Sequence, residues 1–184
     1  MALGRNVIAV FLVVGAGLGV AFAPARNWVV SRYDRVEHKI SHLIHPSYTP
    51  VHATRITWST ATPPHPASNV ADGYKNTFWS VRLPTQLPSV TFHFDKKVSL
   101  NKAIFYDGDG HNYQATDRAD AIHVVYSNGH ASDISLKDSV DPQTVSLSGA
   151  KDITSVTFEI TSMYRSASAT HLRLSEIELF HLNV

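Results

Sequence analysis

Acidic residues are the side chains whose spacing first suggests chemistry in this sequence. Asp107, Asp109, Asp117 and Asp120 fall within one short stretch, which begins with the run DGDG. Two carboxylates about 5–10 Å apart serve as the acid and base of glycosidases, and DGDG resembles the start of a calcium loop. The stretch lacks the remaining ligands and the closing glutamate of an EF-hand. We therefore predict a solvent-exposed loop whose glycines form turns.

Other catalytic patterns are absent from the sequence. It contains no Gly-x-Ser-x-Gly elbow, no phosphate-binding loop and no dinucleotide fingerprint. It also contains no cysteine, which excludes disulfides, thiolate zinc sites, iron–sulfur clusters and cysteine nucleophiles. The sequence therefore predicts a protein that is not an enzyme.

The overall charge argues against one class of partner. Lysine and arginine total 16 against 15 acidic residues, which gives a net charge of +1. Domains that bind nucleic acid usually carry a large basic excess. We therefore expect no nucleic-acid partner.

The N-terminal part carries a membrane signal. Residues 7–23 read VIAVFLVVGAGLGVAFA and contain no charge, a composition that favours insertion into lipid. Arg5 and the AFA run at 21–23 also fit a cleaved signal peptide, although Pro24 follows poorly after a cut. Continuing the helix through Trp28 approaches the length needed to span a bilayer. We predict a retained transmembrane anchor over residues 1–31.

A short amphipathic helix and a linker are expected at residues 32–50. Apolar residues recur at helical spacing in VEHKISHLIHP, and Pro46 ends the run. His38, His42 and His45 share its other face. Histidines spaced this way can hold a metal, but no acid of the metalloprotease pattern lies between them, so we interpret them as a polar edge.

Residues 51–184 carry the pattern of a β-domain. Short runs with two-residue alternation are separated by turn residues. Val90, Phe92 and Phe94 alternate with polar residues in one run, and Asn128-Gly129 is a strong hairpin signal. The expected strands are residues 55–58, 89–94, 102–107, 121–126, 131–136, 143–147, 155–163 and 176–182. Eight strands of this kind predict an all-β sandwich of jelly-roll type.

Several motifs in this part resemble a known family. ASNVADGYKNTFW at 67–79 is similar to the signature near the start of discoidin-like, galactose-binding-like domains. AIHVVYSNG at 121–129 and LSEIELF at 174–180 resemble the hairpin and closing strand of that fold. Lys137-Asp138, Gln143 and ITSMY at 160–164 further resemble the NADase-type glycan-binding domain of bacterial membrane-anchored proteins. The resemblance implies a discoidin-like β-sandwich, and it places Trp79 in the core.

The resemblance also implies a structural calcium ion. By position, its ligands are Asp72, Thr77 and Glu176, with carbonyl oxygens around Tyr74. Calcium binds six to eight oxygens, which a tight Asp-Gly turn can supply in part. In the alternative interpretation, Asp72 caps its own turn and Glu176 pairs with a base such as Arg173.

A ligand is expected at loops that share one end of the sandwich, namely residues 58–66, 107–118 and 164–171. Sugar sites combine aromatic faces with forked hydrogen-bond donors. The candidate ligand-binding residues are Tyr113, Arg118, Tyr164, Arg165 and His171. Arg118 has an equal alternative, in which it ties its loop to Asp117 or Asp120.

These observations predict a single-pass membrane protein with an extracytoplasmic binding domain. The positive-inside rule alone favours the opposite orientation, because Arg26, Arg32, Arg35 and Lys39 follow the hydrophobic run. That rule counts mainly short loops, and members of the resembled family typically lie outside the cell. The expected ligand is a glycan or other cell-envelope polymer. The alternative is a structural or accessory subunit that docks a membrane-protein partner.

Overall fold

The computed structural model describes residues 48–82 and 87–183. Contacts divide the chain into two units, residues 1–44 and 45–184, and the described residues all belong to the second. The anchor predicted at 1–31 and the amphipathic helix after it lie outside them and stay predictions. Within the described ranges, no helix is long and apolar enough to cross a membrane.

One sheet is built around the long C-terminal strand. Strand β10 (His171–Leu182) pairs along one side with β5 (Lys102–Asp107), which pairs in turn with β8 (Gln143–Ser146). The other side of β10 is shared by two short strands, β3 (Trp79–Arg82) and β1 (Tyr48–Pro50). All of these pairs are antiparallel.

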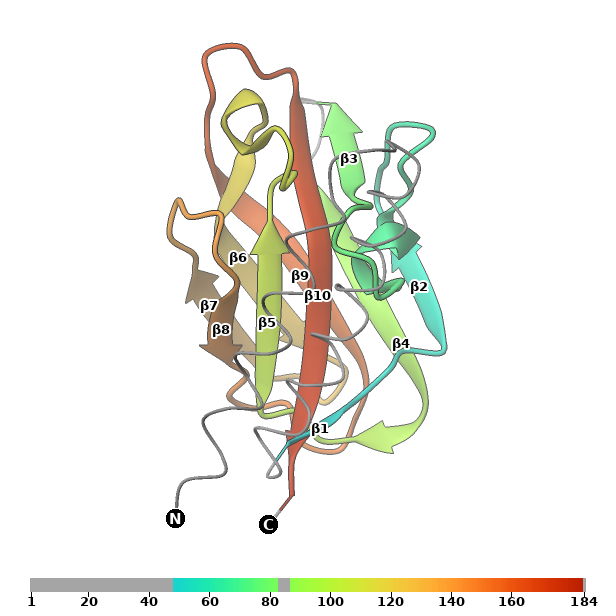
Figure 1. The fold of residues 1–184 in the computed structure, drawn as a ribbon. Coiled ribbons are helices and arrows are strands. Elements are labelled where there is room, and N and C mark those ends of the chain that lie inside the picture. Colours follow the sequence, from blue (N-terminus) through green and yellow to red (C-terminus); the bar gives the residue numbers. More distant parts are fainter. Residues whose placement is uncertain (1–47, 83–86, 184) are drawn as a thin grey trace, which may run out of the picture. The chain divides into compact units, whose positions relative to one another are not determined.

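The second sheet also has five antiparallel strands. Its order is β2 (Arg55–Trp58), β4 (Ser89–Val98), β9 (Ile153–Tyr164), β6 (Arg118–Tyr126) and β7 (Ala131–Ser135). Figure 1 shows the two sheets as layers packed face to face. The prediction of an all-β sandwich is therefore confirmed.

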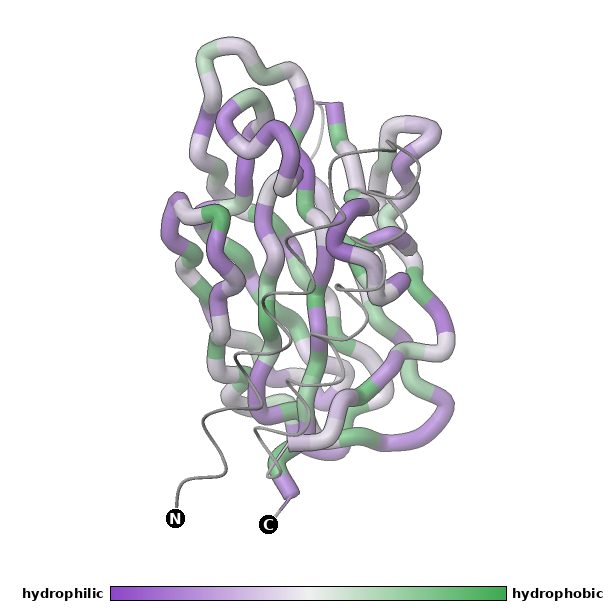
Figure 2. Tube along the Cα trace, in the orientation of Figure 1, coloured by the Kyte–Doolittle hydropathy of each residue, from purple (hydrophilic) through white to green (hydrophobic). Residues whose placement is uncertain are grey.

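The core lies between the two sheets. Alternate residues of strands such as β4 and β5 face inward, and Figure 2 shows hydrophobic and hydrophilic positions alternating along the strands. Phe158 of β9 packs edge-on against Phe92 of β4 and Phe105 of β5, with ring centroids 5.6 and 5.5 Å away, and so joins the two layers. Trp79 is 1% exposed and donates from Nε1 to the carbonyl of Thr60, which confirms its predicted place in the core.

The predicted number of strands is wrong. Each of the eight expected runs forms a strand. The described residues contain two further strands, β1 and β3, which makes ten. Both are short and lie at the edge of their sheet beside β10. Segments of three or four residues are too short for an alternating pattern to stand out, so pairing with β10 decides their conformation.

The loops expected to bind a ligand do gather at one end of the sandwich. Residues 58–66, 107–118 and 164–171 all lie at the upper end in Figure 1, and we call this region the loop end. The 3-10 helix η2 (Tyr113–Ala115) lies within the 107–118 loop, and the 3-10 helix η1 (Ala67–Ala71) follows the 58–66 loop. Strand β1 and the turn at 127–130 lie at the opposite end.

Candidate functional site

Asp107 holds the two ends of the 107–118 loop together. Its Oδ1 accepts hydrogen bonds from the backbone N–H groups of Gly108 at 3.0 Å and Ala119 at 3.1 Å. Its Oδ2 is buried and has no partner among the described residues. Burial raises the pKa of Asp107 to about 7, although the two N–H groups oppose the shift.

The prediction of a solvent-exposed loop holds for residues 110–112, 114 and 115 but not for three of its acidic residues. Asp107, Asp109 and Asp117 are only 4%, 8% and 0% exposed. Backbone N–H groups and arginine side chains satisfy most of their oxygen atoms, which allows carboxylates to be buried. These buried acids hold the loops in place through hydrogen bonds from backbone N–H groups and from Arg173.

Arg118 supports the loop from below. It is 6% exposed and forms a bidentate pair with Asp138, from Nε to Oδ1 at 2.7 Å and from Nη2 to Oδ2 at 2.9 Å. Its Nη1 donates to the carbonyls of Tyr113 and Thr116. Four of the five guanidinium N–H donors are thus used by the protein. Arg118 does tie its loop, but to Asp138 and not to Asp117 or Asp120.

Tyr113 completes the same network. Its hydroxyl donates to Asp138 Oδ1 at 2.9 Å, and the Arg118 guanidinium lies 4.8 Å from its ring centroid. Burial and the hydrogen bond to Asp138 raise the pKa of Tyr113. Gly108 packs against the Tyr113 ring with a φ of +75°. A Cβ at this position would lie 2.8 Å from Tyr113 Cδ2, so only glycine fits without a shift. Tyr113 and Arg118 therefore lie together, and Tyr164 lies beside them as the direct strand partner of Arg118.

Tyr164, Arg165 and His171 lie along the 164–171 loop, whose ends are the last residue of β9 and the first residue of β10. The Tyr164 hydroxyl donates to the carbonyl of Leu136 at 3.0 Å. Arg165 is 60% exposed, and its Nε lies 3.4 Å from the buried Asp117 Oδ2. His171 accepts at its carbonyl oxygen from the Asp117 N–H, and its Nδ1 is hydrogen bonded to Thr170. Asp117 therefore connects Arg165 and His171, while the Arg165 side chain reaches solvent.

A further group of side chains at the loop end was not predicted as a site. The Arg173 guanidinium lies 4.4 Å from the Phe78 ring centroid, and Arg173 Nη1 donates to Asp109 Oδ2 at 2.5 Å. His65 stacks on the same Phe78 ring, with centroids 4.2 Å apart and planes at 28°. We call Phe78, His65, Arg173 and Asp109 the Phe78 cluster.

The Phe78 cluster combines the two elements that sugar recognition needs. Phe78, His65 and Arg173 are partly exposed, and Arg173 Nε is buried with no partner in the described part of the chain. Because Phe78 is stacked with His65 and lies under Arg173, the partly exposed His65 imidazole is the aromatic group that can contact C–H groups, and the arginine–carboxylate pair offers fixed hydrogen bonds. The sequence contains only a weak indication of this cluster, because Arg173 lies in an apolar strand and Asp109 in a glycine-rich loop.

The residues predicted to bind calcium also lie close together. Asp72 Oδ1 accepts from the N–H of Tyr74 at 2.9 Å, and the Thr77 hydroxyl lies 2.8 Å from Asp72 Oδ2 and 2.9 Å from the Tyr74 carbonyl. Glu176 is 4% exposed, and its Oε2 has no partner among the residues described. Burial and the nearby Asp72 and Glu178 carboxylates raise its pKa to about 9, although the N–H of Gly73 opposes this.

This donor set fits a hard cation. The described residues contain no group of three His, Cys, Asp or Glu side chains suited to a metal, so carbonyl and hydroxyl oxygens would have to complete the shell, as calcium accepts. The unpartnered Glu176 Oε2 is the oxygen that such an ion would satisfy. The alternative pairing of Glu176 with Arg173 is wrong, because Arg173 pairs with Asp109.

The fold and the polar loop end define a discoidin-like β-sandwich. A family model described as "NAD glycohydrolase translocation F5/8 type C domain" matches residues 51–180. The chain belongs to this family. No curated protein matches the chain.

Solved structures share the fold at low sequence identity. An F5/8 type C domain from Bacteroides fragilis is 12% identical, with 75% of this chain and 99% of that chain covered and a TM-score of 0.57. The family 32 carbohydrate-binding module of NanJ from C. perfringens, solved with galactose, is 13% identical, with coverages of 73% and 99% and a TM-score of 0.53. Truncated AlyQ, with carbohydrate-binding and alginate lyase domains, is 14% identical with a TM-score of 0.55. The match covers 74% of this chain but only 34% of AlyQ.

Proposed function

We propose that this domain is a non-catalytic module that binds carbohydrate at its loop end. The observation that carries the proposal is the Phe78 cluster, in which an aromatic ring, a guanidinium and a carboxylate are held in fixed contact at a partly exposed surface. Because Arg118 and Tyr113 are engaged with Asp138, their role is to support the loop from which Asp109 reaches Arg173. Arg165 and His171 border this region as secondary contacts.

The structural neighbours support the class of ligand. The NanJ module was solved with galactose, the AlyQ module with 4,5-unsaturated mannuronic acid, and a C. perfringens module with GlcNAc-α-1,4-galactose. These proteins share the fold of this chain and bind different sugars. They support carbohydrate as the ligand without selecting one sugar.

The proposed location is the outer face of a cell membrane, with a cell-envelope glycan as ligand. The uncharged run at residues 7–23 supports a membrane anchor. The outer location rests on the resemblance to a family whose members typically lie outside the cell, because the arginines after the run favour the opposite orientation and that rule counts mainly short loops. A chain anchored at its N-terminal side and carrying its binding domain outside would meet envelope polymers directly.

A second candidate function is docking of a protein partner by the same domain. The family description names the translocation of an NAD glycohydrolase, and this wording favours an accessory role beside another protein. A glycan array separates the two proposals, because a module that only docks a protein should bind no glycan class.

A structural calcium ion is part of the proposal. Asp72, Thr77 and Glu176 would hold it together with the Tyr74 carbonyl, next to the turn that precedes Phe78 and Trp79. The ion would compensate the buried charge of Glu176 and fasten the Asp72 turn to β10.

The test is a glycan array probed with the full chain in detergent. Binding of one glycan class should be lost in Arg173→Ala and reduced in Asp109→Asn, while the exposed Lys96→Ala at the opposite end should bind normally. Melting curves of each variant establish that it is folded. If Arg173→Ala is folded and binds as well as the unchanged protein, the Phe78 cluster is not the sugar site.

A further inference from the structure

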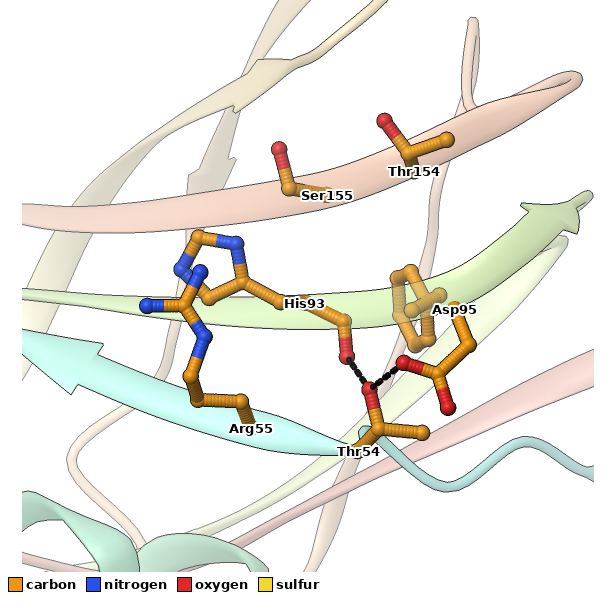
Figure 3. A pocket seen from close by; sticks show the side chains of 7 residues that line it. Thr54, Arg55, His93, Asp95, Thr154 and Ser155 are labelled. Atoms are coloured by element: carbon orange, nitrogen blue, oxygen red, sulfur yellow. Dashed lines mark hydrogen bonds between the residues drawn. The ribbon is translucent and has the colours of Figure 1, made fainter.

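A concave region lies on the outer face of the β2–β4–β9 sheet, away from the loop end. It has a volume of about 540 Å³. Its lining includes polar side chains from three neighbouring strands or their ends, as Figure 3 shows: Thr54, Arg55, His93, Asp95, Thr154 and Ser155. None of these residues belongs to the Phe78 cluster or to the predicted calcium site.

Strand register places the central side chains in one row. Arg55 of β2 is the direct partner of His93 of β4, and His93 is the direct partner of Ser155 of β9. Directly paired residues of antiparallel strands point to the same side of the sheet. Phe92 and Phe94 on either side of His93 are buried, so the row faces outward. Figure 3 shows the Arg55 guanidinium beside the His93 ring.

The row carries positive charge that the described residues do not neutralise. Arg55 is exposed and has no ion pair within the described part of the chain. Burial and the nearby Arg55 charge lower the pKa of His93. His93 Nε2 is hydrogen bonded to the Thr57 hydroxyl at 2.8 Å, which fixes the ring. The Ser155 hydroxyl has no hydrogen-bond partner in the described ranges.

Asp95 is the one acid in the lining, and it limits what the region can bind. Its Oδ1 accepts from the Thr54 hydroxyl at 2.9 Å, and Figure 3 shows the carboxylate turned towards Thr54 and away from Arg55. A dianion such as phosphate would be repelled by this charge. A singly charged ligand that also carries hydroxyl groups would gain from it, because a carboxylate accepts hydrogen bonds from sugar hydroxyls.

We infer that Arg55, His93 and Ser155 form a binding site for the carboxylate of an acidic sugar, with Asp95 accepting from its hydroxyl groups. Arginine offers a planar pair of donors that matches a carboxylate, and Ser155 adds a third. The site lies on a different surface from the proposed glycan site and does not rest on it. Its occupant would be a uronic acid residue, free or within a polymer.

Titration of His93 gives a local readout of binding. The charged groups near the ring are Arg55 on β2 and Asp95 on β4, and β9 contributes only the hydroxyls of Ser155 and Thr157. A bound carboxylate favours the protonated imidazole. Added glucuronate should therefore raise the pKa of His93, and binding should strengthen as the pH falls through that pKa.

The experiment is an NMR titration of the full chain in detergent with sodium glucuronate, with glucose as the neutral match and sulfate as the inorganic match. Glucuronate should shift the His93 ring signals and raise the pKa of His93, and glucose should do neither. Arg55→Ala should weaken glucuronate binding by about tenfold, the effect of losing one charge-assisted contact. The exposed Arg82→Ala should bind normally.

Separate outcomes overturn this inference and the proposed glycan site. Arg173→Ala should leave glucuronate binding at His93 unchanged, whatever it does on the glycan array. Equal shifts with glucose, equal losses in Arg55→Ala and Arg82→Ala, or an unmoved His93 would each refute the acidic-sugar site. Sulfate binding more tightly than glucuronate would show a general anion site and would refute the inferred role of Asp95.

Discussion

Replacing Glu176 by Gln should make the domain more stable at alkaline pH. The pKa of this buried carboxyl is raised from 4.5 to about 9, mainly by burial and next by the Asp72 and Glu178 carboxylates. Between these two pH values the folded protein keeps a proton that the unfolded chain loses. The stability due to this proton is complete below pH 4.5 and is lost as the pH rises towards 9.

The size of the effect follows from this difference. Each pH unit within the window costs about 1.4 kcal/mol, so the unchanged protein should lose about 4 kcal/mol of unfolding free energy between pH 5 and pH 8 through Glu176. Glutamine has the shape of the protonated acid and no charge to desolvate. Glu176→Gln should therefore lose little over the same interval, apart from the contribution of Asp107, whose pKa of about 7 acts in the same direction in both proteins.

The assay is urea unfolding at pH 5 and pH 8 in the presence of a chelator. Glu159→Gln, a change on the outer face of β9, is the matched control and should keep the full pH dependence. The quantity compared is the loss of unfolding free energy between pH 5 and pH 8. If this loss is the same in Glu176→Gln and in the unchanged protein within about 1 kcal/mol, the carboxyl of Glu176 ionises normally and the prediction is wrong.

Calcium provides an independent arm of the same experiment. An ion at Asp72, Thr77 and Glu176 would replace the proton, so calcium should raise the stability of the unchanged protein most at pH 8 and should have no effect on Glu176→Gln. A melting temperature that is indifferent to calcium at pH 8 would refute the calcium site and leave the pH prediction standing.

Three further substitutions test the packing and the support of the loop end. Trp79→Ala should cost about 3–5 kcal/mol in urea unfolding, because the ring is 1% exposed; a loss below about 1 kcal/mol would place the ring outside the core. Arg118→Ala should cost about 2–3 kcal/mol by removing a charged pair with Asp138 and two carbonyl contacts, and an unchanged melting temperature would contradict that role. Gly108→Ala should cost about 2 kcal/mol, because its φ is +75° and the new Cβ would meet Tyr113; equal stability would show that the loop has another conformation available.

The strands could be predicted from the sequence because burial acts on every second residue. Val90, Phe92 and Phe94 show this pattern and face the core. The Asn128-Gly129 turn was also predictable, since Gly129 has a φ of +87°. Strand β3 was missed because its four residues are buried, buried, buried and exposed, a pattern that carries no alternation. Its conformation depends on β10, far away in the sequence.

The site was predicted less completely because its charges are paired across loops. Tyr113 and Arg118 were identified, but their partner Asp138 comes from the connection between β7 and β8. Arg173 and Asp109 are also distant in the sequence. A sequence shows which side chains can form ion pairs, whereas the choice among several acids and arginines is made by the way the loops pack.

The shared edge of β10 has a mechanical consequence. Strand β1 leads into the domain antiparallel to the last residues of β10, pairing Tyr48 with Leu182 and Pro50 with Phe180, at the end opposite the loops (Figure 1). A pull on the chain before Tyr48, resisted at the loop end, would run along the strand axes. The hydrogen bonds between β1 and β10 would then be loaded in shear. They would bear the force together with the bond from Val51 N–H to the Leu179 carbonyl, and they would not break one after another. The chain thus enters the domain through a ladder that resists stretching, at the end opposite the polar loops.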